Sequence, residues 1–77
     1  MNTPQEAIAA EVRAALARRK IDQSEVAEAL ALSRSSVSQR INGHRPFSVA
    51  QLITIGTMCG VEPAEFFRTI SADSRAA

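Results

Sequence analysis

The 77-residue chain is long enough for only one small domain, and its 45% apolar residues are typical of folded rather than disordered proteins. No apolar run approaches the roughly 18 residues that span a membrane, and the N-terminus does not resemble a secretory signal. Its single cysteine, Cys59, excludes an internal disulfide and a multi-cysteine zinc site. We therefore expect a cytoplasmic protein without a metal, a cofactor or a small-molecule ligand.

The net charge of +1 is uninformative, but the charges are unevenly distributed. Residues 1–28 contain five acidic and four basic side chains, whereas residues 29–61 contain Arg34, Arg40 and Arg45 and no acid. A basic segment on a nearly neutral protein favours a surface that faces a polyanion. Chance clustering of three arginines is the alternative explanation.

Helix start signals recur along the chain. The first is Thr3-Pro4-Gln5-Glu6, a capping box with proline in the first helical position. Four later segments place a capping position between two apolar residues, as expected for a hydrophobic staple around an N-cap: IDQSEV from residue 21, LSRSSV from 32, FSVAQL from 47 and VEPAEF from 61. Together these signals predict five helices, over residues 4–19, 23–30, 34–42, 49–59 and 63–70.

The spacing of apolar residues predicts which side of each helix is buried. The residues expected to face the core are Ile8, Val12, Leu16, Val26, Ala27, Leu30, Val37 and Ile41. Leu52, Ile53 and Gly56 are expected on or near the packed face of their helix. No segment has the pattern of a strand, so the expected fold is all-α. We expect one domain over residues 1–70 and a frayed tail over residues 71–77. The short gap between the second and third helices predicts a sharp crossing between them.

The third predicted helix has an unusual polar face. Val37 and Ile41 lie one turn apart and must face the core, while Ser35, Gln39 and Asn42 lie opposite them. This face has no acid, and its serines are poor helix formers. Short hydroxyls, an amide and an arginine suit the base edges of a DNA major groove, which admits an α-helix. An ordinary solvated face is the alternative, although such faces usually mix Glu with Lys.

The segment QSEVAEALALSRSSVSQRINGHRPFSVAQLITIGTMCGV, residues 23–61, resembles the lambda-repressor-like (Cro-type, XRE) helix-turn-helix family. Gln23 stands where that family opens its first motif helix, Ala27 at its small packing position and Val37 at its inward position in the recognition helix. The resemblance covers about residues 8–70. It implies a compact five-helix DNA-binding domain whose second and third helices form the motif.

The resemblance also implies roles for individual side chains on double-stranded DNA. The residues that it places against base edges are Ser33, Arg34, Ser35, Ser38 and Gln39. Those that it places against phosphates are Gln23, Ser36, Arg40, Asn42, His44 and Arg45. The implied function is a transcriptional regulator, Cro-like in repressing by occupancy of a palindromic operator as a homodimer.

The chain departs from the family pattern at two positions. The motif turn normally has glycine because the backbone is left-handed there, and this chain has Ala31, which implies a reshaped turn or a strain of about 1 kcal/mol. Arg40 stands where the family has an apolar residue, and Ile41 is apolar instead. We expect Arg40 either to reach a phosphate or to pair with Glu25 or Glu28.

Phe66 and Phe67 are adjacent in the last predicted helix, so one is expected to fill the core and the other to form a dimer patch with Ile70. The chain contains no nucleophile and base pair and no phosphate-binding glycine loop, so we do not expect an enzyme. The alternative function is an antitoxin or another protein-interaction module that retains a helix-turn-helix. An extended binding tail or a large exposed apolar patch is the feature that favours this alternative.

Overall fold

The computed structural model describes residues 3–68, which form four α-helices and one 3₁₀ helix and contain no strand. The elements are α1 (Pro4–Arg18), α2 (Gln23–Leu30), α3 (Arg34–Ile41), α4 (Val49–Cys59) and η1 (Pro63–Phe67). The all-α prediction is confirmed. Within the part of the chain that the structure describes, no helix is sufficiently long and apolar to cross a bilayer.

The fifth predicted α-helix is wrong in type, because residues 63–67 form a 3₁₀ helix. Glu62 precedes it without donating or accepting a side-chain cap hydrogen bond, so this helix lacks the start signal that the other four have. Short 3₁₀ segments of this kind are common connectors. Residues 69 and 70 of the expected helix, and the tail over residues 71–77, lie outside the described residues.

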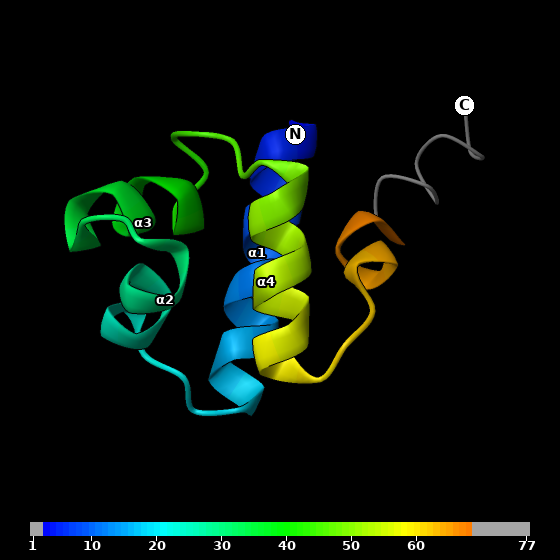
Figure 1. Ribbon diagram of the computed structural model, residues 1–77. Coiled ribbons are helices and arrows are strands. Elements are labelled where there is room, and N and C mark those ends of the chain that lie inside the picture. The colour runs from blue at the N-terminus through cyan, green and yellow to red at the C-terminus, as the bar shows by residue number, and fades with distance from the viewer. Residues whose placement is uncertain (1–2, 69–77) are drawn as a thin grey trace.

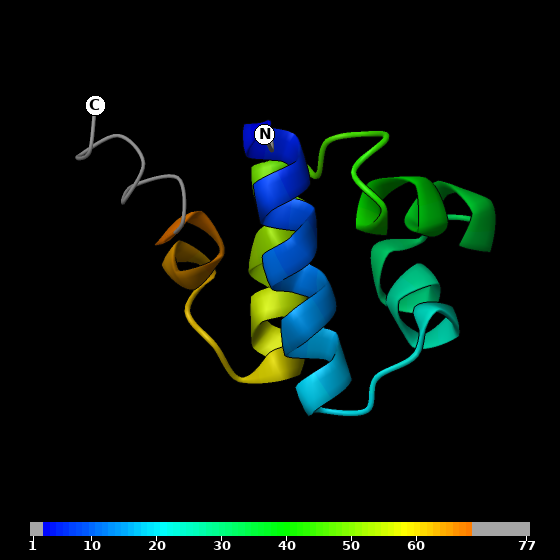
Figure 2. The ribbon, with the colours of Figure 1, turned by 180° about the vertical axis from the view of Figure 1, so that it is seen from behind.

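The helices are arranged around α1 and α4, which lie side by side in the middle of the molecule (Figures 1 and 2). The α2–α3 pair packs on one side of them, and η1 packs on the other. The α2–α3 pair is therefore an outer layer, and α3 contacts the rest of the fold through α2 and α1.

The predicted N-caps are confirmed at all four α-helices. The side chains of Thr3, Asp22, Ser33 and Ser48 each accept a hydrogen bond from the backbone N–H three residues later. At α1 the cap is reciprocal, since the Thr3 N–H donates to Glu6 Oε1 over 2.9 Å. This bond, with a second from the Thr3 side chain, lowers the pKa of the Glu6 carboxyl. Each such cap typically contributes about 1 kcal/mol.

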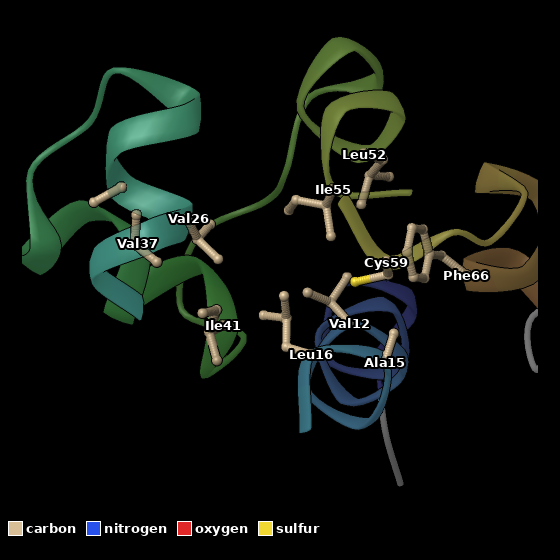
Figure 3. Packing of buried hydrophobic residues seen from close by; sticks show 11 residues of the cluster. Val12, Ala15, Leu16, Val26, Val37, Ile41, Leu52, Ile55, Cys59 and Phe66 are labelled. Carbon is tan, nitrogen blue, oxygen red and sulfur yellow. The ribbon is translucent and has the colours of Figure 1, made fainter. Parts of the chain in front are cut away.

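The core collects side chains from every helix (Figure 3). Most of the predicted core residues are buried, and Ile8 and Leu30 pack against the core while remaining half-buried. Phe66 of η1 inserts its ring beside Cys59 of α4, and each is 1% exposed. Burial raises the pKa of the Cys59 thiol, against the smaller opposing effect of Arg19, so Cys59 acts as a small apolar residue.

Of the three α4 residues expected on or near the packed face, Leu52 and Gly56 are buried, whereas the Ile53 side chain is 50% exposed. The buried stripe of α4 consists of Leu52, Ile55, Gly56 and Cys59, which recur at helical spacing. Ile53 lies about 100° around the helix from Leu52 and belongs with Val49, which is 69% exposed. α4 therefore has a second apolar side that no element among residues 3–68 covers.

The α2–α3 turn keeps its left-handed geometry without glycine. Ala31 has φ 55° and ψ 43°, so the chain accepts the strained option rather than a reshaped turn. The Ala31 N–H bonds the Glu28 carbonyl over 3.3 Å, and the Leu32 N–H bonds the Ala27 carbonyl over 2.9 Å. This pair of bonds closes α2 as a Schellman motif, which requires a left-handed residue between the helices.

We expect Ala31→Gly to raise the free energy of unfolding by about 0.5–1 kcal/mol, since relief of the left-handed strain outweighs the added freedom of the unfolded chain. Urea denaturation followed by circular dichroism measures the change. Ala29→Gly is the matched control, because Ala29 is exposed inside α2 and its loss should cost about 1 kcal/mol. Equal destabilisation by both variants would show that Ala31 is not strained.

Candidate nucleic-acid interface

α3 is attached to the core through one narrow side. Val37 is fully buried and Ile41 is 4% exposed, and they are the only buried residues of this helix. Ser35, Gln39 and Asn42, on the opposite side of the helix, are exposed, and α3 lies at the outer edge of the molecule (Figure 1). This arrangement confirms the predicted orientation of α3, with its polar residues away from the core.

Three α3 side chains on or beside this outward side are exposed and have no hydrogen-bond or ion-pair partner in the described residues. Within residues 3–68, the side chains of Arg34, Ser35 and Gln39 form no hydrogen bond or ion pair. Arg34 and Ser35 are in the first turn, and Gln39 is one turn after Ser35. Their donors and acceptors are therefore available to a ligand that lies along α3.

Ser33 and Ser36 are partly engaged in starting the helix. Ser33 Oγ accepts from the Ser36 N–H over 3.1 Å and donates to Ser36 Oγ over 3.1 Å. The Ser33 hydroxyl is thus used twice within the first turn. Ser33, which is predicted to read a base, therefore also has a structural role as the N-cap of α3.

Ser38 and Asn42 are coupled at the other end of α3. Asn42 Nδ2 donates to the Ser38 carbonyl over 2.9 Å and to Ser38 Oγ over 3.3 Å. Ser38 is half-buried, whereas Asn42 is exposed. The Asn42 amide nitrogen therefore supports the helix end, while its side-chain oxygen stays open to a donor.

Arg40 folds back along its own helix. Its Nη1 donates to the Ser36 carbonyl over 3.0 Å, and its Nε is buried without a hydrogen-bond partner in the described part of the chain. Among residues 3–68, no ion pair joins Arg40 to Glu25 or Glu28. The half-buried stem covers the side of α3 beside the buried stripe, which explains how an arginine occupies this position.

Gln23 and Arg34 lie at one open hollow between α1, α2 and α3. Its apolar lining includes Leu16, Ile21 and Ile41. The hollow brings the predicted phosphate-binding amide at the start of α2 next to the arginine at the start of α3. Arg13 and Asp22 line the same hollow, so an anion there meets the Gln23 amide, two guanidinium groups and one carboxylate.

The loop segment that carries His44 and Arg45 is held to α3 by backbone hydrogen bonds. The N–H groups of His44 and Arg45 both donate to the Gln39 carbonyl, over 2.8 and 3.3 Å. Both side chains are exposed. The two predicted phosphate-binding residues are thus tied to the same helical turn that carries the Gln39 side chain.

Two side chains that the sequence did not single out contact the end of α3. Gln5 Nε2 donates to the Gly43 carbonyl over 2.7 Å, and Arg13 Nη1 donates to the Ile41 carbonyl over 2.6 Å. These partners are 38 and 28 residues apart in the chain. No local spacing rule could have found them, because the contacts arise only when α1 packs beside α3.

We expect Ser33→Ala to lower the free energy of unfolding by about 1 kcal/mol, because it removes the oxygen that caps α3. Thermal and urea denaturation measure the loss. Ser35→Ala is the control, since the Ser35 hydroxyl is exposed and forms no hydrogen bond within the described residues. A Ser33 variant as stable as the Ser35 variant would remove the capping role.

A helix-turn-helix family model matches residues 12–66, which include α2, the left-handed turn and all of α3. Among curated proteins, none matches the chain significantly. The matched segment also contains the free side chains of α3 and the loop after it. The chain therefore belongs to the lambda-repressor-like (XRE) helix-turn-helix family, whose members are DNA-binding transcription regulators.

Proposed function

We propose that this protein is a sequence-specific repressor that binds a palindromic operator as a homodimer and acts by occupying it. The observation that carries the proposal is the set of free polar side chains on an acid-free helix that only Val37 and Ile41 fix to the core. An α-helix with such a side fits the major groove of double-stranded DNA.

Arg34, Ser35 and Gln39 are the proposed base-reading residues. Arginine pairs bidentately with guanine and glutamine with adenine, while serine donates to or accepts from several base edges. Ser33 and Ser38 are proposed to contribute less to base reading than these three residues. The Ser33 hydroxyl is engaged with Ser36, whereas the Ser38 hydroxyl accepts from Asn42 and keeps its hydrogen for a base.

Phosphate contacts are proposed for residues at both ends of the α2–α3 unit. Gln23 serves one strand at the start of α2, and His44 and Arg45 serve the backbone after α3. Ser36, Asn42 and Arg40 complete the proposed set. Of these, Arg40 uses Nη1 for the Ser36 carbonyl, and Nη2 is the group proposed to contact phosphate. Such contacts supply most of the affinity and fall with added salt.

The proposed dimer uses the uncovered side of α4. Phe66 fills the core and Phe67 is half-buried against it, while Ile70 lies outside the described residues. The exposed large apolar side chains in residues 3–68 are Val49 and Ile53, which lie one turn apart. Because α4 contains no charged residue, two copies can face each other there without repulsion between like charges.

The α4 patch also bears on the alternative of an antitoxin or another protein-interaction module. Two exposed side chains make a small patch, which suits a contact that DNA brings together better than a large protein-neutralising surface. The function as a repressor is therefore preferred. Recovery of one stoichiometric protein partner in a pull-down would favour the alternative.

Selection of bound sequences from a random duplex pool tests the function, and a palindromic consensus with half-sites about 34 Å apart is the expected result.

We expect Gln39→Ala or Arg34→Ala to relax preference at one base position per half-site by about tenfold. Arg45→Ala should instead weaken binding to all sequences and flatten the salt dependence. Absence of any consensus would refute the proposal, and an unchanged specificity of Gln39→Ala would refute its reading role.

We expect Ile53→Glu to weaken dimerisation by about tenfold or more, because it replaces buried apolar area at the two-fold contact with two like charges. Sedimentation equilibrium with and without operator DNA measures the change. Ala14→Glu is the matched control, since it adds the same charge at an exposed position of α1. If Ile53→Glu associates as the unsubstituted protein does, the dimer contact lies elsewhere.

A further inference from the structure

The C-terminal end of α3 satisfies its carbonyl groups from two sources. The last four carbonyls of an α-helix have no partner within the helix. Here the Ser38, Gln39 and Arg40 carbonyls accept from the backbone N–H groups of the following turn, over residues 42–45. The remaining Ile41 carbonyl, and that of Gly43 just beyond the helix, accept from α1 side chains.

The two bonds from α1 are short and partly shielded from water. Arg13 Nη1 lies 2.6 Å from the Ile41 oxygen and Gln5 Nε2 lies 2.7 Å from the Gly43 oxygen, and both bonds are part-buried. Arg13 also places a positive charge at the negative end of the α3 dipole. Charge-assisted bonds of this kind are stronger than neutral ones.

The backbone at Gly43 is fitted closely to α1. Its φ of +83° is a left-handed conformation, and a Cβ added there would lie 3.2 Å from the Glu6 Cγ. Both conditions favour glycine. α1 thus contacts the chain after α3 by steric fit as well as by hydrogen bonds.

We propose that Gln5 and Arg13 are positioning residues that set the angle at which α3 and the loop after it enter the DNA groove. This inference rests on the proposed function of α3 as the base-reading helix. α3 has two buried side chains on one narrow side, so its core contacts alone leave it free to rock about that line. The turn at Ala31 holds its first end, and the two bonds from α1 hold its last end.

The two hydrogen bonds from α1 lie at the C-terminal end of α3, so they should affect the proposed DNA contacts at that end most. The Gln39 carbonyl accepts from the N–H groups of His44 and Arg45, so the Gln39 turn and the loop move as one unit with the end of α3. Arg34 lies at the other end, beside the turn from α2. Loss of the α1 bonds should therefore relax base preference at the position read by Gln39 more than at the position read by Arg34.

A direct phosphate contact by Arg13 is the competing explanation, and Gln5 separates the two. Gln5→Met removes a donor without changing the charge, while Arg13→Met removes a donor and a charge. If the two residues position α3, both variants share the same loss of base preference, and the salt dependence of Gln5→Met stays unchanged. If Arg13 only neutralises a phosphate, Arg13→Met weakens all sequences evenly and flattens the salt dependence.

The experiment compares the unsubstituted chain, Gln5→Met, Arg13→Met and Arg18→Met by sequence selection and by amide hydrogen exchange without DNA. Arg18→Met is the control, because Arg18 is an exposed arginine of α1 with no hydrogen bond or ion pair within residues 3–68. All binding is measured well below the midpoint of thermal unfolding, so that a change in stability alone does not alter the base preference.

In the two test variants we expect about a tenfold loss of preference at the Gln39 position, retention at the Arg34 position and faster exchange at residues 42–45. Faster exchange with unchanged base preference would make the bonds purely structural and overturn the inference. Unchanged exchange would overturn it as well. Failure of the unsubstituted chain to select any sequence would instead refute the proposed function. The hydrogen-exchange data would still show whether the Gln5 and Arg13 bonds stabilise residues 42–45.

Discussion

Burial of Val37 and Ile41 is the contact on which the whole interface depends. These two apolar side chains lie one turn apart and turn one side of α3 toward the core, while the hydrogen bonds at its two ends hold its angle. Each side chain contributes about 1.5–3 kcal/mol when fully buried, so a narrow anchor is still energetically sufficient. Because only Val37 and Ile41 are buried, the remaining surface of α3 can carry polar side chains. A wider buried stripe would require apolar residues at those positions.

The polar residues of α3 lower its helix propensity, and hydrogen bonds at both ends of the helix offset this loss. Three of its eight residues are serine, which forms helices less well than alanine or leucine. Ser33 caps the first turn, and Arg13 bonds the last carbonyl. The turn at Ala31 accepts backbone strain to bring α3 across α2 at the required angle. The ends of α3 therefore determine its orientation as much as its buried residues do.

Local signals in the sequence predicted the four α-helices because a cap acts within four residues, as at Asp22 and Ser48. Prediction of the buried side of α4 was less accurate, since Leu52 and Ile53 are adjacent and equally apolar, and only packing decides between them. The bond from Gln5 to Gly43 joins residues 38 positions apart and has no local signature. The proposed DNA contacts came from the family resemblance together with side-chain chemistry, and the structure divides them into free and engaged groups.

If α3 reads bases as proposed, its few free polar groups limit the specificity that one copy can supply. A good bidentate side-chain contact to a base discriminates by about 1–3 kcal/mol, so the contacts proposed for Arg34 and Gln39 would together supply about 2–6 kcal/mol. Specific complexes typically exceed non-specific ones by about 4–10 kcal/mol. A second copy on a two-fold operator doubles the first figure to about 4–12 kcal/mol, which covers that range. This comparison supports the proposed homodimer, for which the uncharged side of α4 is the proposed contact.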